Sequence, residues 1–204
     1  MTVERFMLYH VHFRAFSTLP SILASISHFH CRSYFSSPIV SRSVTRALQG
    51  AKRVFGSPSV SRKMITKDIL SSLYSLTLRP DASFITFRTV WRVFIEFYGL
   101  LRFSEVSQLR FVDISWTDLG FDMFIAKSKT DQTRKGDWVA VASQPASCPC
   151  PVAFTRKYLS LLPYDSGYIM PSVKKSVPDS ATPLQYNTAL RDLQSALRSV
   201  GIDP

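Results

Sequence analysis

The chain has 204 residues, of which 46% are hydrophobic and 13% aromatic, and its formal net charge is +11. This length holds one sizeable domain or two small ones, and the apolar content excludes a chain that is disordered throughout. No apolar run approaches the roughly 20 residues that span a bilayer. The strongly basic balance is typical of proteins that meet nucleic acid or an anionic membrane surface.

The positive charge is concentrated in the first third of the chain. Residues 1–66 carry nine lysines and arginines against one acid, a net charge of +8, whereas residues 67–204 carry sixteen against thirteen, a net charge of +3. This asymmetry predicts a basic binding module followed by a more balanced domain. The first 60 residues are also rich in Arg and Ser and poor in acids, which is the composition of an organellar leader.

The first 35 residues contain one helix that the pattern predicts. Residues 1–17 mix His, Phe and Arg without a clear period, and we assign them no structure. Residues 19–35 place Ile22, Ile26 and Phe29 at helical spacing, which predicts a helix. A Ser-Pro pair then ends it.

A second, basic helix is predicted over residues 41–55. Ser41 or Ser43 can serve as its N-cap, and Gly56 stands where a left-handed residue ends a helix. Its apolar face is too small for a dedicated membrane anchor, so we expect no membrane partner. Its cations, with those of the basic linker that follows, are candidate contacts to DNA phosphates: Arg42, Arg46, Lys52, Arg53, Arg62 and Lys63.

The rest of the chain reads as helices around a small sheet. Apolar periodicity predicts helices over residues 66–76, 83–98, 104–109, 149–162 and 183–200. Strand-like runs, rich in β-branched and aromatic residues, cover residues 111–116, 123–126 and 138–142. The predicted fold class is therefore mainly α with a small antiparallel three-stranded sheet.

Three cysteines, Cys31, Cys148 and Cys150, are too few and too sparse for a disulfide scaffold. They fit a reducing compartment, and we expect a nuclear or cytoplasmic location, with mitochondrial import as the alternative. Cys148 and Cys150 have no second Cys/His pair at zinc-ligand spacing, so no metal site is predicted.

Two motifs carry candidate phosphate-binding cations. Residues 99–109 read Gly-Leu-Leu-Arg-Phe-Ser-Glu-Val-Ser-Gln-Leu, which places Arg102 at the head of a new helix with Glu105 three residues later. A turn between two strand-like runs carries Lys127, Lys129, Arg134 and Lys135. An arginine at a helix start and a lysine on a hairpin are suited to bind one phosphate. Two alternatives stay open: Arg102 caps its own helix or pairs with Glu105, and the hairpin cations form a solvated tip that contacts backbone phosphates.

The motifs together resemble a known family. Gly-x-x-Arg-x-Ser-Glu, followed by a strand, by Ser-Lys-Thr-Asp on a hairpin and by a helix that a Cys-Pro pair opens, is similar to the tyrosine recombinases, or phage integrases. Ala47-Leu-Gln-Gly-Ala-Lys-Arg and Ile65-Thr-Lys-Asp-Ile-Leu resemble recombinases of DIRS-type and Crypton-type mobile elements. The resemblance implies a helical core-binding domain in residues 1–62, which binds DNA, and a partial catalytic domain in residues 63–204.

The resemblance also implies a chemistry for the two motifs. Arg102 would bind the scissile phosphate, and Lys129 would act as general acid toward the leaving 5′-oxygen, with Lys127 as the alternative. Glu105 is taken as structural. The partner would be double-stranded DNA, with self-association on it, and the reaction would need neither a metal nor another cofactor.

The later motifs of that family have no counterpart in this sequence. They are a His-x-x-Arg, a later His or Trp, and the tyrosine nucleophile. Every histidine here lies at or before His30, and none of the eight tyrosines has the nucleophile's context. We therefore expect a truncated, catalytically incomplete recombinase that binds DNA. The alternative that stays open is an organellar protein with a cleavable basic leader and a helical interaction domain.

Overall fold

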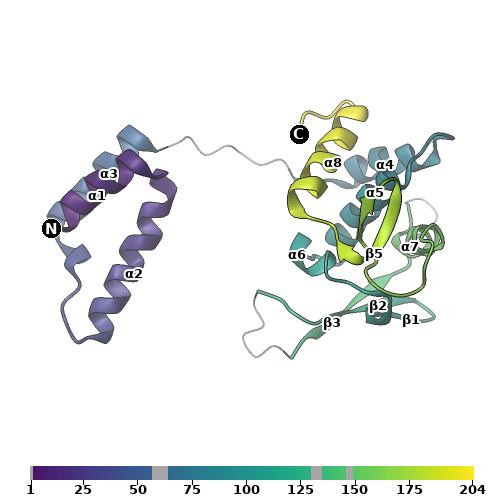
Figure 1. The fold of residues 1–204 in the computed structure, drawn as a ribbon, viewed down its shortest axis with the longest axis horizontal. Coiled ribbons are helices and arrows are strands. Elements are labelled where there is room, and N and C mark those ends of the chain that lie inside the picture. The colour runs from purple at the N-terminus through teal and green to yellow at the C-terminus, as the bar shows by residue number, and fades with distance from the viewer. Residues whose placement is uncertain (1, 57–63, 130–134, 146–148) are drawn as a thin grey trace. The chain divides into compact units, whose positions relative to one another are not determined.

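The structure is a computed structural model, and it describes residues 2–56, 64–129, 135–145 and 149–204. The chain divides into two compact units, Met1–Lys63 and Met64–Pro204 (Figure 1). Each unit has a hydrophobic core of its own. Among the described residues, no helix combines the length and the apolar content that crossing a membrane requires.

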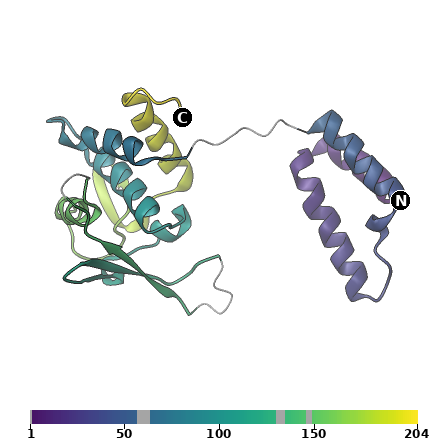
Figure 2. The ribbon, with the colours of Figure 1, turned by 180° about the vertical axis from the view of Figure 1, so that it is seen from behind.

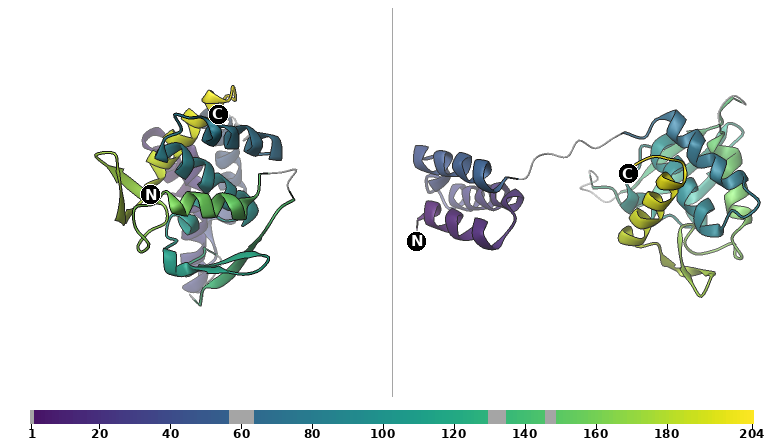
Figure 3. Two further views of the ribbon diagram at one scale, coloured as in Figure 1. Left: turned by 90° about the vertical axis from the view of Figure 1, so that its right-hand side faces the viewer. Right: turned by 90° about the horizontal axis from the view of Figure 1, so that it is seen from above.

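The described part of the first unit consists of three α-helices and two short 3-10 turns. The helices are α1 (Val3–Phe13), α2 (Leu19–Arg32) and α3 (Arg42–Phe55), and the turns are Phe16–Thr18 and Pro38–Val40. Helix α1 contacts both α2 and α3, and Figure 3 shows this bundle from above. The buried side chains between the helices are Met7, Val11, Leu19, Leu23, Val44 and Ala51.

Helix α1 lies in the segment to which the sequence pattern assigned no structure. The Thr2 hydroxyl caps it by accepting a hydrogen bond from the Arg5 N–H at 3.4 Å. Only Met7 and Val11, one turn apart, are buried. The apolar stripe is therefore narrow, and the histidines and exposed aromatic residues beside it hide the helical period.

One detail predicted for the first unit was wrong, and one apolar side chain of the predicted helical spacing is not buried. The Phe29 side chain is 73% exposed, and the buried face of α2 runs through Leu19 and Leu23 instead. Gly56 is extended, with φ −70°, and is not left-handed. Its N–H still closes the last turn of α3, because it donates to the Lys52 carbonyl.

The second unit is organised around one long buried helix. The helices are α4 (Lys67–Ser75), α5 (Phe84–Tyr98), α6 (Phe103–Val106), α7 (Pro151–Ser160) and α8 (Tyr186–Ser199). Residues 87–95 of α5 are all buried, and α5 packs against α4, α6, α7 and α8. Figure 2 shows α4, α5 and α8 on the same side of the three-stranded sheet.

That sheet has the order β1-β2-β3 and is antiparallel throughout. Its strands are β1 (Ile114–Trp116), β2 (Gly120–Ile125) and β3 (Asp137–Ala142). Phe121, Met123 and Ile125 alternate along β2 and are buried against the core. The mainly α fold class with a three-stranded antiparallel sheet is confirmed. The first strand is shorter than predicted, because Phe111–Asp113 form a 3-10 turn.

A second sheet pairs β4 (Pro171–Lys174) with β5 (Val177–Pro183), and the sequence pattern missed it. Its two-residue turn is Lys175-Ser176, with φ values of 48° and 66°. Such turns usually carry Asn-Gly or a similar pair, because the left-handed region favours those residues. The hairpin therefore has no turn signal in the sequence.

Buried polar groups fix α8 and the second sheet against α5. Arg88, which is 1% exposed, donates from Nη1 to the Pro171 carbonyl at 2.6 Å and from Nη2 to Asp192 at 2.7 Å. The Trp91 indole donates to the Thr155 hydroxyl at 3.0 Å. These bonds join α5 to β4, α8 and α7. Arg88 needs such partners, because a buried charge is stable only when it is paired or hydrogen-bonded.

Candidate functional site

Arg102 lies at the N-cap of α6 and is held by the acid of the same turn. Glu105 Oε2 accepts a hydrogen bond from the Arg102 N–H at 2.7 Å, and Oε1 accepts one from Arg102 Nη1 at 3.0 Å. The Glu105 side chain is 5% exposed, whereas that of Arg102 is 51% exposed. The structure thus contains the Arg102–Glu105 pair and still presents the guanidinium to solvent.

Glu105 is held as a carboxylate. Burial raises its pKa, but the hydrogen bonds from the Arg102 N–H, Ser128 and the Arg102 guanidinium lower it by more, so its pKa lies below the ordinary value. An ionised Glu105 is the form that orients Arg102, since a protonated carboxyl offers weaker acceptors.

Ser128 connects the hairpin to this pair. Its hydroxyl donates to Glu105 Oε1 at 2.7 Å and accepts a hydrogen bond from Arg102 Nη1 at 3.4 Å. Lys127 and Lys129, on either side of it, are exposed. Ser128, three residues beyond the end of β2, thus ties the segment that carries both lysines to the Arg102–Glu105 pair.

Two adjoining hollows surround this connection. The hairpin groove, of about 880 Å³, is bordered by α6, the base of the β2–β3 hairpin, Tyr168 and the start of α8. Its cations are Arg110, Lys127 and Lys129. The Arg102 hollow, of about 580 Å³, is lined by Arg102 and Lys135. Glu105 and Ser128 line both, so the candidate cations of α6 and of the hairpin face neighbouring space.

The acids of the hairpin groove are engaged within the fold. Both oxygens of Glu105 accept hydrogen bonds, and Asp113 Oδ2 accepts one from the Arg110 N–H at 2.8 Å. With Arg110, Lys127 and Lys129 against these two carboxylates, the lining of the groove carries a net positive charge. A groove lined by one sign of exposed charge attracts an oppositely charged ligand.

The other predicted cations lie on α3 or outside the described residues. Arg42, Arg46, Lys52 and Arg53 are all exposed on α3, away from its buried Val44 and Ala51. Arg46 and Arg53 are two turns apart and share one face. The predicted contacts Arg62, Lys63 and Arg134 lie outside the described residues, as does Cys148.

The sequence pattern missed three residues of the hairpin groove, Arg110, Ser128 and Tyr168. A signal for Arg110 exists in the sequence: Arg110-Phe-Val-Asp113 repeats the Arg-Phe-x-acid spacing of Arg102-Phe-Ser-Glu105. In both copies the acid accepts a hydrogen bond from the arginine's own N–H. Ser128 and Tyr168 carry no such signal, because their contacts join segments 23 and 58 residues apart.

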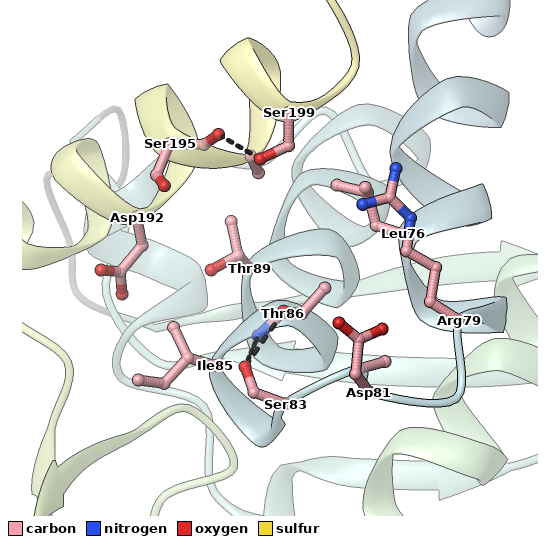
Figure 4. Close-up of a pocket in the computed structure, with 12 residues that line it drawn as sticks. Leu76, Arg79, Asp81, Ser83, Ile85, Thr86, Thr89, Asp192, Ser195 and Ser199 are labelled. Atoms are coloured by element: carbon pink, nitrogen blue, oxygen red, sulfur yellow. Dashed lines mark hydrogen bonds between the residues drawn. The ribbon is translucent and has the colours of Figure 1, made fainter.

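A smaller cavity of about 280 Å³ lies between the start of α5 and α8 (Figure 4). It is lined by hydroxyl groups and by charges of both signs, Arg79 with Asp81 and Asp192. Ser83 is already engaged in capping α5 through the Thr86 N–H. This mixed lining favours no one class of ligand. The described residues also include no group of three or more His, Cys, Asp or Glu side chains that could hold a metal ion.

Comparison with known proteins gives the family context. No family model matches the chain. An integrase/recombinase XerD homologue from Selenomonas ruminantium is 24% identical over 190 residues, which cover 91% of this chain and 52% of that protein. The chain thus spans about half the length of this relative.

Among solved structures, the crystal structure of XerA recombinase matches with a TM-score of 0.48 and 16% identity. The match covers 98% of this chain and 70% of the XerA chain. The sequence match to the integrase/recombinase covers both described units, including α6 and the β2–β3 hairpin. In sequence, the chain is therefore similar to a protein of the integrase/recombinase class over most of its length.

Proposed function

We propose that this chain binds duplex DNA as a tyrosine-recombinase-type protein, and that Arg102 and Lys129 contact one DNA phosphate. The observation that carries the proposal is the Ser128 bridge. It ties the lysine hairpin to the Arg102–Glu105 pair, so cations from two elements face neighbouring hollows. Lys127 is also exposed and borders the same groove as Lys129, and it is the alternative lysine.

The chemistry of the two side chains suits a phosphate. A guanidinium is permanently charged and donates two parallel hydrogen bonds to phosphate oxygens. Glu105 fixes one edge of that guanidinium while half of the side chain stays exposed. A lysine on the adjoining hairpin adds a mobile point charge, which can follow the position of a phosphate oxygen.

The first unit supplies further contacts in this proposal. The four exposed cations of α3 contact the phosphate backbone without reading the base sequence. The sequence match covers 91% of the chain and so includes most of residues 1–60. That coverage favours a recombinase module over the alternative of a cleavable organellar leader.

We further propose that the 204-residue polypeptide is catalytically incomplete. Beyond Arg102 and Lys129, the sequence offers no His-x-x-Arg segment and no tyrosine in the nucleophile's context. DNA recombination by a protein of this type then requires groups that this polypeptide lacks. DNA binding does not require them, because it rests on the cations alone.

The test is a salt titration of DNA affinity with single-residue variants. Wild type, Arg102→Ala, Lys129→Ala and Lys127→Ala are titrated with a duplex oligonucleotide between 50 and ~200 mM salt, the range over which phosphate contacts dominate affinity changes. Loss of one phosphate contact lowers the log–log salt slope by about 1. The control is Arg191→Ala, which removes an exposed arginine of α8 outside both hollows.

The expected result is a reduced slope for Arg102→Ala and Lys129→Ala and an unchanged slope for Arg191→Ala. A reduced slope for Lys127→Ala in place of Lys129→Ala would move the lysine contact to position 127. Equal slopes for wild type and Arg102→Ala would overturn the site, and no binding by wild type at low salt would overturn the function.

A further inference from the structure

Arg110 is an exposed arginine whose side chain is held in one orientation. Its guanidinium carbon lies 4.8 Å from the centroid of the Tyr168 ring. Its Nη2 also donates a hydrogen bond to the Tyr168 hydroxyl at 3.2 Å. The Asp113 carboxylate accepts a hydrogen bond from the Arg110 N–H at 2.8 Å, which fixes the backbone below the side chain. Ordering a long exposed side chain costs conformational entropy, so this orientation requires an explanation.

Contacts that do not involve the Arg110 side chain already join its segment to that of Tyr168. The backbones of Arg110 and Tyr168 already pair as an antiparallel bridge, and the Ile169 N–H donates to the Leu109 carbonyl at 3.0 Å. The flanking Leu109 and Ile169 are 2% and 0% exposed and supply the packing. The segments would therefore stay joined if either side chain of the Arg110–Tyr168 pair were removed.

Its position points to a ligand. Arg110 and Tyr168 border the hairpin groove together with Lys127 and Lys129. The guanidinium uses Nη2 for Tyr168, and its other nitrogens have no hydrogen-bond partner among the described residues. A guanidinium fixed in this way, in a groove whose exposed charges are positive, is oriented for an anion.

We propose that Arg110 is a third DNA-phosphate contact of this surface and that Tyr168 is its positioning residue. The inference rests on the proposed function, since the ligand is the backbone of the same duplex. It extends that function along the hairpin groove, from the hairpin lysines to the segment that precedes β1. Tyr168 contacts no DNA in this proposal. It lowers the entropy that Arg110 loses on binding, because the stacked guanidinium is already ordered.

The chain offers a matched control for a stacked arginine. Arg156, on α7, is exposed and lies with its guanidinium carbon 4.1 Å from the centroid of the Trp116 ring. It does not line the hairpin groove. Arg110→Ala and Arg156→Ala thus remove the same charge and the same kind of stack, and only one of them removes a cation from the groove.

The experiment is a salt titration of duplex binding by the full chain. We expect Arg110→Ala to lower the log–log salt slope by about 1 and Arg156→Ala to leave it unchanged. Tyr168→Ala should weaken binding in the wild-type background and have no further effect in the Arg110→Ala background. Tyr168→Phe keeps the ring and should recover part of the affinity that Tyr168→Ala loses. Thermal unfolding shows that each variant keeps the fold.

The outcomes separate this inference from the proposed function. If wild type binds DNA and Arg102→Ala weakens it, but Arg110→Ala behaves like Arg156→Ala, the Arg110 contact is wrong and the function stands. If Tyr168→Ala weakens binding equally in both backgrounds, its positioning role is wrong. If wild type shows no salt-dependent binding, the proposed function itself fails.

Discussion

At the scale of single residues, Glu105 links the candidate site to the stability of the fold. It satisfies the N–H of its own N-cap residue, one edge of the Arg102 guanidinium and the Ser128 hydroxyl. The pair of Arg102 and Glu105 was foreseeable, because both residues lie in one helical turn. The Ser128 bridge was not, because it depends on how the hairpin folds back onto α6.

This arrangement predicts a pH-dependent effect of Glu105→Gln. The folded-state pKa of Glu105 is below its ordinary value of 4.5, so its ionised form stabilises the folded state above that pH. This contribution is lost as pH falls from about 4.5 through the lower folded-state pKa. We expect Glu105→Gln to reduce the free energy of unfolding by about 1–3 kcal/mol at pH 7 and by less at pH 3. All three tryptophans lie in residues 64–204, so urea unfolding followed by their fluorescence measures this unit.

Glu96→Gln is a control for which we expect the pH dependence of the stability change to have the opposite sign. Burial raises its pKa above the ordinary value, although Arg92 nearby lowers it in part. A raised pKa means that ionisation of Glu96 opposes folding, so its cost appears as pH rises. Relative to wild type, Glu96→Gln should therefore gain stability between pH 4 and pH 7. A Glu105→Gln variant whose loss of stability is the same at pH 3 and pH 7 would contradict the assignment of an ionised, hydrogen-bonded Glu105.

At the scale of elements, the predictions succeeded where a periodic pattern carried its own end signals. Ser41, Thr66 and Ser83 were foreseen at or beside helix starts, and each hydroxyl accepts a hydrogen bond from an N–H three residues later. Helix α1 was missed because only two of its side chains are buried. The β4–β5 hairpin was missed because its turn, Lys175-Ser176, lacks residues that favour positive φ.

The same turn predicts a stabilising substitution. Both of its residues have positive φ, a conformation that costs an ordinary L-residue about 1 kcal/mol or more. Lys175→Asn combined with Ser176→Gly installs the pair preferred in such turns, and we expect the free energy of unfolding to rise by about 1 kcal/mol. The measurement is urea unfolding of residues 1–204 followed by tryptophan fluorescence. Lys175→Ala is the control, because it removes the same charge without relieving the backbone. Equal stability of the two variants would show that the turn is not strained.

At the scale of the whole molecule, the charge asymmetry predicts how DNA affinity divides between the two units. Four exposed cations lie on α3, and a variant that changes all of them to alanine should lower the log–log salt slope by about 3–4. The Arg102→Ala, Lys129→Ala double variant should lower it by about 2. A larger effect of the double variant than of the α3 variant would place most of the binding on the second unit.

The final prediction is that the 204-residue polypeptide binds DNA but forms no covalent complex with it. Strand cleavage through a tyrosine requires that nucleophile in line with the scissile phosphate, and cations around the phosphate oxygens. Under the proposed function Arg102 and Lys129 would supply two such cations, whereas every histidine of the sequence lies at or before His30. Loss of one well-placed donor to a developing charge typically costs about 2.7–4 kcal/mol of transition-state stabilisation, and several donors are missing here.

The measurement is incubation with nicked duplex substrates, which trap a covalent intermediate, followed by a denaturing gel. Of the eight tyrosines, Tyr158 is buried and donates to the Ile169 carbonyl at 2.8 Å, and burial raises its pKa well above the ordinary value. Tyr164 is partly buried, which raises its pKa to about 12. Tyr186 and Tyr168 border the hairpin groove, so they are the tyrosines to substitute first if a covalent band appears. A covalent band that forms with wild type but not with Tyr186→Phe or Tyr168→Phe would contradict this prediction. It would show that the polypeptide cleaves DNA with a tyrosine that does not match the nucleophile motif of tyrosine recombinases.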